Sequence, residues 1–540
     1  MFSYEITPLS NLFFTLTIIV FSSLFVVKNE NRDIFLHSLL LVSLGTIFYA
    51  NNFITFFIGW EVMTWSSYFI ISKTANQNTL QKYIAFNVGA GFVLLGAIIL
   101  IFGFCGSFIY SEIDFSLVPE FYTNIIVCLF LIAIFIKSGV VPFHFWVVDT
   151  YNESNNIFSV ILSAIISKVG IFTFIVVFIQ IIKLENIESI VLDIVAWVGV
   201  ITSIIATFKA ISQDDMKKLL AYSSIAQVGY IVTIMAIFTS TAIEGALYHT
   251  IIHTFVKLLL FVNIAAIIYI TGQTKFSQLG RLLYKYPLNF ILLTIGIIAL
   301  AGMPPLGGFS SKFLIYTTLL EEKKALLLVA VMFSSASAFL YCYKLVYGIY
   351  LGQSTNDIEQ YKKIPNSFYI PQIIGAIVVI VLGIFPSLIV PFFNDILVSL
   401  GLEAFDFTSI YELNTTISSF NGAVVMGVFI GLFMIILAIF MSIKNKAIKN
   451  KDRYDISYCG EVPIDDVNLH YGYGMGQELK KVSFIKVILE NSSSKLWNKI
   501  EKIVLDISIV IKRLYSLATQ NIIILILLVF TIVLFIGVSR

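Results

Sequence analysis

Residues 245–270 read GALYHTIIHTFVKLLLFVNIAAIIYI. This stretch is long and apolar enough to cross a bilayer, which takes about 20 residues in a helix. It nevertheless carries His249, His253 and Lys257 at four-residue intervals, and this spacing places all three on one helix face. An ionisable group at bilayer depth costs about 2.5–3.5 kcal/mol. The stretch therefore predicts a membrane helix whose titratable side chains have a functional role.

The same conflict between apolar surroundings and ionisable groups recurs in four other runs of the chain. Seven such groups together represent a cost of roughly 20 kcal/mol. Intramembrane groups of this kind usually mark ion or proton paths. We therefore predict a proton path made of Glu61, Lys137, Lys168, His249, His253, Lys257 and Lys312.

The composition predicts an all-α, polytopic membrane bundle. Of the 540 residues 58% are hydrophobic and 12% are charged, whereas soluble domains carry roughly 25% charged residues. The alternating ten-residue segments of a barrel are absent from the sequence. The apolar runs predict about fourteen transmembrane helices, near 7–28, 34–50, 52–73, 80–104, 123–147, 157–182, 190–211, 217–238, 242–271, 286–320, 325–350, 370–394, 421–443 and 520–538.

Two of these spans are predicted to be broken. Lys137–Pro142 interrupts the fifth span and Gly302–Gly308 the tenth. Proline removes a backbone donor and clashes with the preceding turn. Paired interruptions at corresponding places indicate a repeated transporter core, here two inverted five-helix repeats. Two chance kinks are the alternative.

The chain divides into three predicted parts. Residues 1–443 form the transmembrane bundle, 444–519 a basic stretch and a lateral amphipathic helix, and 520–540 a C-terminal transmembrane anchor. Within 478–519, apolar residues such as Ile500 and Ile503 alternate with charged ones such as Lys499 and Glu501. This pattern suits an ordinary interfacial helix or a strut along neighbouring subunits.

Loop charges predict the orientation, because cytoplasmic loops carry an excess of Lys and Arg. The opposite loops hold acids such as Glu112, Asp114 and Glu120. We therefore expect a plasma-membrane protein with both termini outside. The basic residues that fall on the other side are Lys28, Arg32, Lys73, Lys217, Lys218, Lys275, Arg281, Lys285, Lys362, Lys363, Lys444, Lys446, Lys449, Lys451 and Arg453.

Glu61 and Lys137 are expected to form an adjustable pair. At about 6 Å and an effective dielectric constant of about 20, they attract by about 3 kcal/mol. Moving the carboxylate away then loosens the proton on the lysine, although a static ion pair is an alternative. Complete burial disfavours the charged form of a lysine, so Lys168 suits a proton carrier better than a snorkelling lysine.

Lys312 has two interpretations, whereas Lys344 and His144 have one each. Lys312 either ends the row near an aqueous exit or snorkels to the surface, and Lys344 is expected to snorkel. His144 is treated as structural. His249 and His253 lack a third metal ligand nearby, so no metal site is predicted.

No cofactor is expected in this chain. Its four cysteines have no paired spacing, and the sequence has no Walker loop, dinucleotide fingerprint, haem site or iron–sulfur ligand set. The chain is therefore expected to have no redox centre, and nucleic acid is not an expected partner. Any energy source other than an ion gradient must then come from partner chains.

These motifs resemble the antiporter-like membrane subunits of complex I (NADH:quinone oxidoreductase), Mrp-type Na⁺/H⁺ antiporters and group 4 [NiFe] hydrogenases. The resemblance covers about residues 5–350 and is closest to the distal type with a lateral helix. It rests on Gly59-Trp60-Glu61, Lys137-Ser138, Pro142–Trp146, Lys168-Val169-Gly170, Asp215–Tyr230, His249–Lys257 and Gly302–Phe309.

The resemblance implies that Glu61 and Lys137 are the coupling pair and Lys168 the central proton carrier. The path would continue through the histidine–lysine row to Lys312. The chain departs from the family pattern at Asn155-Asn156, where an Ala-Pro pair is usual. It also has an apolar stretch around Ala90, where some distal members carry an aspartate.

The resemblance favours a proton-translocating subunit of a multisubunit redox-driven complex, an oxidoreductase whose other membrane subunits are its partners. Two alternatives stay open: a subunit of a Mrp-type antiporter exchanging Na⁺ for H⁺, and a scaffold that moves no ions.

Overall fold

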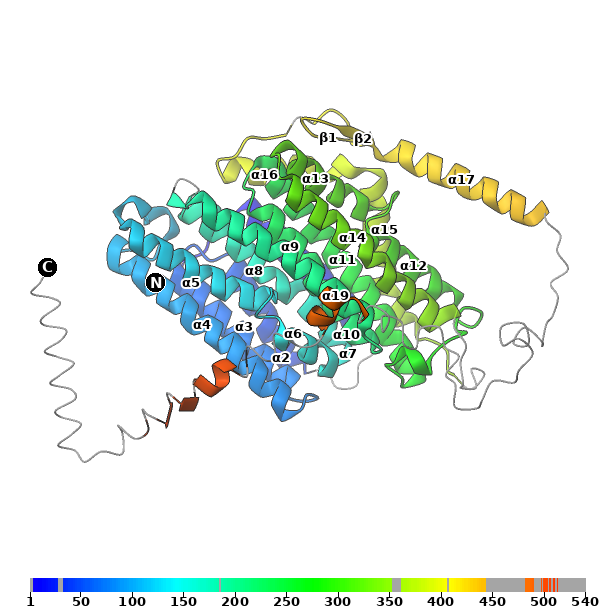
Figure 1. Ribbon diagram of the computed structural model, residues 1–540, viewed down its shortest axis with the longest axis horizontal. Helices are drawn as coiled ribbons and strands as arrows, with labels where there is room; N and C mark the ends of the chain where they lie inside the picture. The colour runs from blue at the N-terminus through cyan, green and yellow to red at the C-terminus, as the bar shows by residue number, and fades with distance from the viewer. Residues whose placement is uncertain are drawn as a thin grey trace, which may run out of the picture. The chain divides into compact units, whose positions relative to one another are not determined.

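The computed structural model describes residues 3–27, 33–183, 186–351, 361–405, 407–442, 481–489, 497, 499–503, 505–506, 508–509 and 512. It separates into two units, residues 1–477 and 478–540. In the described part of the first unit, helices dominate and a short hairpin lies near its end (Figure 1).

The elements of the first half are α1 (Pro8–Phe25), α2 (Ile34–Phe48), α3 (Phe53–Ile71), α4 (Gln77–Cys105), η1 (Tyr110–Glu112), η2 (Phe115–Leu117), α5 (Glu120–Ser138), α6 (Phe145–Glu153), α7 (Asn156–Ile161), the π-helical turn η3 (Leu162–Ile166), α8 (Ser167–Phe174), the π-helical η4 (Ile175–Ile181) and α9 (Ser189–Ser212). Those that follow are α10 (Met216–Met235), α11 (Ser240–Thr271), η6 (Phe276–Gln278), α12 (Pro287–Ala301), α13 (Gly307–Glu321), α14 (Ala325–Val346), η7 (Tyr347–Leu351), η9 (Asn366–Phe368), α15 (Tyr369–Ile384), η10 (Pro386–Ile389), α16 (Val390–Ser399), β1 (Glu412–Asn414), β2 (Ser419–Asn421) and α17 (Gly422–Ser442).

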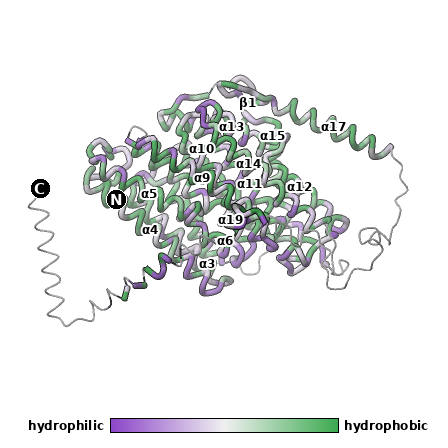
Figure 2. The backbone as a smooth tube through the Cα atoms, viewed as in Figure 1, coloured by the Kyte–Doolittle hydropathy of each residue, from purple (hydrophilic) through white to green (hydrophobic). Residues whose placement is uncertain are grey.

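The predicted all-α membrane architecture is confirmed. In the described part of the chain, 11 helices are long and apolar enough to cross a membrane, and three shorter apolar helices accompany them. Hydrophobic residues make up most of the length of the helices, and hydrophilic residues are more frequent at helix ends and in loops (Figure 2). The expected span 370–394 ends earlier, because α15 stops at Ile384 before Pro386. The expected fourteenth span, 520–538, lies outside the described residues.

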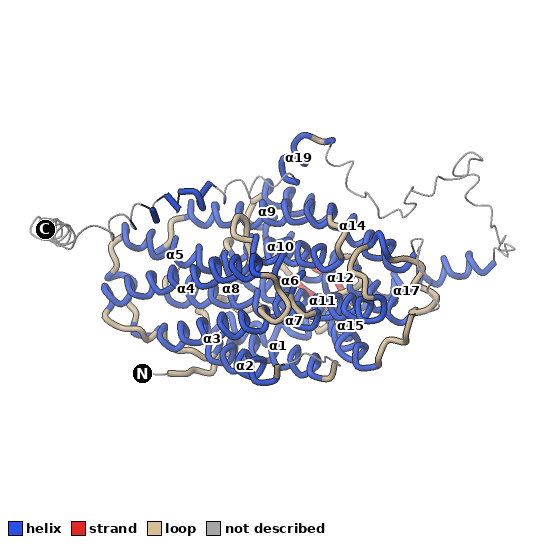
Figure 3. The backbone as a smooth tube through the Cα atoms, turned by 90° about the horizontal axis from the view of Figure 1, so that it is seen from below, coloured by secondary structure: helices blue, strands red, loops and turns tan. Residues whose placement is uncertain are grey.

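The core of the first unit is built around α11. This helix packs against α13 and against α10, α12 and α15, which are labelled near it in Figure 3, and nearly all of its residues are buried. A helix that is apolar on all sides belongs in the interior. Beside it, α9 and α10 approach closely at Gly199 and Gly229, where an added methyl group would lie 2.7 and 2.6 Å from the other glycine's carbonyl oxygen.

Both expected helix breaks are present and share one backbone geometry. At the first, α5 ends before Gly139 (φ 74°), and at the second, α12 ends before Gly302 (φ 76°). In each, the amide after the glycine donates to the carbonyl five residues earlier, from Val140 to Phe135 (2.9 Å) and from Met303 to Ile298 (3.1 Å). Glycine suits this left-handed end of a helix because it has no Cβ. The shared geometry, five spans apart, is what a repeat predicts.

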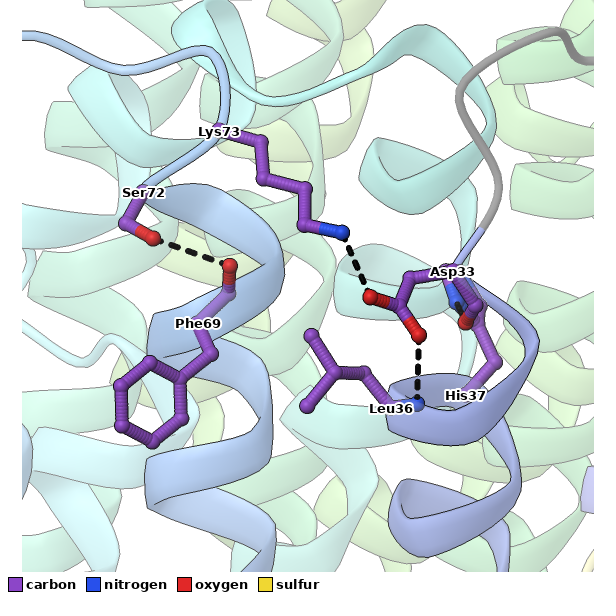
Figure 4. A network of polar contacts seen from close by, with 6 residues as sticks. All are labelled: Asp33, Leu36, His37, Phe69, Ser72 and Lys73. Carbon is purple, nitrogen blue, oxygen red and sulfur yellow. Dashed lines mark hydrogen bonds and ion pairs between the residues drawn. The ribbon is translucent and has the colours of Figure 1, made fainter.

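An exposed network joins the start of α2 to the end of α3 (Figure 4). Asp33 caps α2 by accepting from the Leu36 amide at 3.1 Å, and it accepts from Lys73 Nζ at 2.6 Å. The His37 ring approaches the Asp33 carbonyl at 2.7 Å. The network thus fixes the two helix ends to each other.

The second unit contains α19 (Ser483–Leu489) and further helical residues among those described between 497 and 512. Lys499, Glu501 and Ile503 are exposed, whereas Ile500 is partly buried. The expected part boundaries at 443/444 and 519/520 lie outside the described residues, as does the basic stretch 444–476. The lateral-helix assignment therefore stays a prediction.

Candidate functional site

Lys137 lies in the last turn of α5, directly before the first break, and it is buried. Its Nζ donates to Thr64 Oγ1 of α3 at 3.2 Å and to Asn87 Oδ1 of α4 at 3.3 Å. The amine also lies 5.1 Å from the centre of the Trp60 ring, within the range of a cation–π contact. Side chains of two other helices therefore hold this amine.

Glu61 is half-buried on α3, one turn before Thr64. It interacts electrostatically with Lys137, but no direct ion pair joins the two within the described residues. A methyl group added at Gly91 of α4 would lie 2.0 Å from Glu61 Oε1. The missing side chain of Gly91 therefore makes room for this carboxylate. Glu61 and Lys137 thus interact electrostatically without direct contact, and Thr64 and Asn87 accept the hydrogen bonds of the Lys137 amine.

Lys168 lies at the start of α8, just after the π-helical turn η3. Its Nζ donates to the Ser163 carbonyl at 2.6 Å and to Ser167 Oγ at 3.2 Å, and it lies 2.8 Å from His253 Nδ1. A neutral histidine can accept from an ammonium group at Nδ1. Lys168 and His253 are therefore in direct hydrogen-bond contact, although they are 85 residues apart in the chain.

The two histidines of α11 lie one above the other, with nearly parallel rings whose centres are 6.3 Å apart. His249 Nδ1 lies 2.9 Å from Ser311 Oγ, and its Nε2 lies 3.0 Å from Gln227 Oε1. His253 Nε2 is buried and has no hydrogen-bond partner among the described residues. The row thus keeps one ring nitrogen available for a further proton-transfer partner.

Lys257 continues the row towards α10, where its Nζ donates to Ser223 Oγ at 2.6 Å and to the Leu220 carbonyl at 3.2 Å. Electrostatic interactions connect it with Lys168 and His253. Its position on the same helix face as the histidines follows from the four-residue spacing.

Lys312 is buried on α13, so its amine does not snorkel to the surface. Its Nζ donates to the Ala301 carbonyl at 2.7 Å, the Leu300 carbonyl at 3.4 Å and Ser335 Oγ at 2.7 Å. The two carbonyls belong to the broken end of α12, where helix carbonyls lack intrahelical partners. The burial argues against snorkelling, and the place of Lys312 at the end of the row stays a prediction.

The seven predicted residues form two groups. Lys168, the α11 row and Lys312 are linked by contacts and electrostatic interactions, whereas Lys137 interacts with Glu61. The groups approach where α5 meets α8, because a methyl group added at Gly170 would lie 2.0 Å from Ser138 Oγ. Ser138 follows Lys137 directly, and its hydroxyl is buried without a partner among the described residues.

Several polar residues of the site were not predicted. Asn87 lies one turn from Ala90, in the stretch taken as apolar, and Gln227 contacts His249. Glu244 is fully buried near the start of α11. Each could have been found as a polar residue inside a predicted span, but the sequence does not show which helix face it occupies.

Four other interpretations can be compared with the structure. Lys344 does not reach water, because it is buried and donates to the Ile211 carbonyl at the end of α9. Lys217 is expected in a loop, but its buried amine donates to the Ser154 carbonyl at 2.6 Å.

Asn155, where the chain departs from the family pattern, caps α7 by accepting from the Ile157 amide. His144 is buried against Phe145 and Tyr222.

Comparisons with known proteins place this geometry in a family. A family model for the transmembrane region of NADH:quinone oxidoreductase and Mrp antiporter proteins matches residues 50–339. A Na⁺/H⁺ antiporter subunit from Alkalihalophilus pseudofirmus is 29% identical over 317 residues, which are 56% of this chain and 64% of that protein. The chain thus spans less than two thirds of the length of this relative.

Solved structures show the same relationship. A chain of the archaeal membrane-bound sulfane sulfur reductase superposes with a TM-score of 0.86 at 28% identity, covering 99% of this chain and 89% of that one. A chain of the Mrp complex from Dietzia sp. DQ12-45-1b gives a TM-score of 0.73 at 20% identity, with 99% and 56% covered, and shares the fold. Because the family model matches more than half of its residues, this multi-pass membrane chain belongs to the NADH:quinone oxidoreductase/Mrp antiporter transmembrane family.

Proposed function

We propose that the chain is the proton-translocating membrane subunit of a larger redox-driven complex. The observation that carries the proposal is the 2.8 Å contact between Lys168 Nζ and His253 Nδ1, continued by the stacked His249 ring. A lysine amine and an imidazole in hydrogen-bond contact can exchange a proton between them. The burial of both groups keeps that exchange separate from bulk water.

The coupling would begin at Glu61 and Lys137. Partner chains would move the carboxylate, and Lys137 has Thr64 and Asn87 as alternative acceptors. A change of charge at Lys137 would then alter the proton affinity of Lys168 across the contact between α5 and α8. A small displacement of the Glu61 carboxylate can change the protonation of Lys137, because an interaction between buried charges is only weakly screened.

The direction of transport follows from the proposed orientation. The excess of Lys and Arg in one set of loops supports a cytoplasmic position for that set, with both termini outside. Protons would enter from the cytoplasm of a cell with this chain in its plasma membrane and would leave outside. Cysteine accessibility on the two sides of sealed vesicles would test the orientation.

The redox assignment is supported by the sulfane sulfur reductase chain, which matches nearly the whole of this chain and comes from a respiratory membrane complex. A Na⁺/H⁺ antiporter is the second candidate, and the name of the Alkalihalophilus relative favours it. In vesicles holding the native complex, proton movement that starts with an electron donor supports the first. Proton movement that needs a Na⁺ gradient and no donor supports the second.

The carrier role is tested by Lys168→Ala in the assembled complex. We expect proton flux to fall at least tenfold while the subunits still copurify. Lys344→Gln is the matched control, since Lys344 is equally buried but binds the end of α9, away from the row. Normal flux in Lys168→Ala would overturn the carrier role, and normal flux after loss of Glu61, Lys137 and Lys168 together would favour a scaffold.

A further inference from the structure

Glu244 is a buried carboxylate that the predicted proton path does not include. It lies in the second turn of α11 and is only 1% exposed. Neither carboxylate oxygen has a hydrogen-bond partner among the described residues. Leaving a buried polar group without a partner costs several kcal/mol, and such groups in native proteins call for an explanation. A purely structural role is not evident for this side chain.

A cavity of about 420 Å³ lies at the same end of α11. Its lining includes Thr239, Ser240 and Thr241, together with residues 403–405 and 414–416. Ser240 and Thr241 precede Glu244 by four and three residues, which puts them one turn above it on the same side of the helix. Helical side chains lean towards the N-terminus of their helix. Glu244 is not itself part of the lining, but this lean directs its side chain towards the turn that is.

Polar groups connect Glu244 with the histidine row. Tyr248, one turn further along α11, interacts electrostatically with Glu244 and donates to the Leu382 carbonyl at 2.7 Å. Ser310 Oγ donates to the same carbonyl at 3.3 Å, and its hydroxyl also interacts directly with that of Tyr248, so a proton can pass between the two hydroxyls without the carbonyl. Its chain neighbour Ser311 contacts His249 Nδ1 at 2.9 Å. A bridging water between the two serines would complete a route from His249 to Glu244.

The rim of the cavity carries negative charge. Glu403 lines it, and Glu321 accepts from the Thr416 amide at 3.1 Å and from Thr241 Oγ1 at 3.4 Å. Carboxylates beside a cavity raise the local concentration of cations. The cavity thus suits the exchange of protons with water and disfavours the binding of anions.

We propose that Glu244 is the proton-exchanging group between the histidine row and this cavity, which opens on the side proposed to be outside. The inference rests on the proposed function and extends its path. In each cycle the carboxylate takes one proton delivered through Ser310 and Tyr248 and returns it to water in the cavity, so its charge is restored. Ser310 and Tyr248 pass the proton on, and Glu244 binds it before its release.

The test compares Glu244→Gln and Glu244→Asp in the native complex reconstituted in vesicles. Glutamine keeps the shape and a polar head group but cannot bind and release a proton, so flux should fall at least tenfold. Aspartate still titrates and should keep a measurable part of the flux. The matched control is Glu412→Gln, an exposed carboxylate in the hairpin after α16 that lies outside the cavity lining, and it should leave flux unchanged.

A second readout does not depend on flux. A hydrophobic carbodiimide modifies protonated carboxyl groups in apolar surroundings, and mass spectrometry locates the modified residue. We expect modification at Glu244 in the native complex and a loss of flux in proportion to it. An unmodified Glu244, or full flux in Glu244→Gln, would overturn the inference. If Lys168→Ala loses flux but Glu244→Gln does not, only this inference fails; if Lys168→Ala keeps flux, the proposed function itself fails.

Discussion

The two helix breaks share one backbone geometry but bind their lysine amines through different groups. At the first break the Lys137 amine binds side chains, Thr64 Oγ1 and Asn87 Oδ1. The Ile136 carbonyl at the helix end is satisfied instead by the Trp146 indole at 2.9 Å. At the second break Lys312 itself takes the free carbonyls of Leu300 and Ala301.

Because of this difference, Lys137 can respond to movements of neighbouring helices, whereas Lys312 is held in a fixed position. Side-chain acceptors on α3 and α4 move when those helices move, so Lys137 can change partners. Backbone carbonyls at a helix end are fixed in number and place, and leaving them unsatisfied costs free energy. We therefore expect Lys137 to act in coupling and Lys312 to combine a place in the proton path with a structural role.

The largest difference in stability between the two breaks should come from replacing their glycines, Gly139 and Gly302, with alanine. At both, an alanine has to adopt a left-handed conformation, which costs about 1–2 kcal/mol. At Gly302 its methyl group would also lie 2.3 Å from Lys312 Cδ and displace the amine from its carbonyls, adding about 1–3 kcal/mol. At Gly139 it meets the end of the Val147 side chain, which can rotate.

Gly302→Ala should therefore lower the free energy of unfolding by about 3 kcal/mol and Gly139→Ala by about 1–2 kcal/mol. Thermal denaturation of the purified complex, followed for this subunit, measures the order. Equal losses would mean that Lys312 is not anchored by the break.

A smaller difference in stability is expected when the lysines at the two breaks, Lys137 and Lys312, are replaced with methionine. Lys312→Met keeps an unbranched side chain that is one atom shorter but leaves the Leu300 and Ala301 carbonyls unsatisfied, so stability should fall by about 1–3 kcal/mol. Lys137→Met leaves the Ile136 carbonyl paired with Trp146 and strands one buried acceptor, Asn87 Oδ1, so its cost should be about 1 kcal/mol, the low end of the same range. Both should lose proton flux, measured beside denaturation. A larger stability loss in Lys137→Met would reverse the assignment.

The sequence predicts the breaks better than it predicts what surrounds them. Glycine and proline act through the local backbone, so both breaks were predicted at the observed residues, and the four-residue spacing placed the α11 row. The partners of each amine come from other helices. Nothing in the sequence near Lys312 indicates that it reaches back to Ala301, and Asn87 resembles any polar residue in an apolar run. Tertiary packing decides these contacts.

Asn87 provides the next test, because it is the acceptor that makes the first break responsive. Asn87→Leu removes one of the two side-chain acceptors of Lys137 and should slow proton flux several-fold. Asn87→Asp places a carboxylate beside the amine and strengthens the hydrogen bond about twofold, which should hold the proton and also slow flux. Flux assays of both variants, with Asn124→Ala near the surface as control, measure the effect. Faster flux in Asn87→Asp would contradict this account.

The smallest effect is expected at the exposed pair of Asp33 and Lys73, at the far end of the helix that carries Glu61 and Thr64. The hydrogen bond from Lys73 and then that from the Leu36 amide hold the pKa of Asp33 below its ordinary value of 3.8. A carboxyl group with a lowered folded-state pKa contributes stability above its ordinary value and loses it as pH falls through the lowered one. Asp33→Asn keeps the cap on α2, since asparagine caps equally well, and removes only the charge.

The stability difference between the native chain and Asp33→Asn should thus be small at neutral pH, and it should shrink in high salt and disappear below the lowered pKa. Denaturation midpoints over a pH series measure it. Proton flux should stay normal, because α3 is also held along its length by α2, where a methyl group on Gly59 would lie 3.1 Å from the Ser43 carbonyl oxygen. If Asp33→Asn slowed flux as much as Asn87→Leu, the position of the α3 end would control Lys137, and the responsive element would be the whole helix and not its side-chain acceptors.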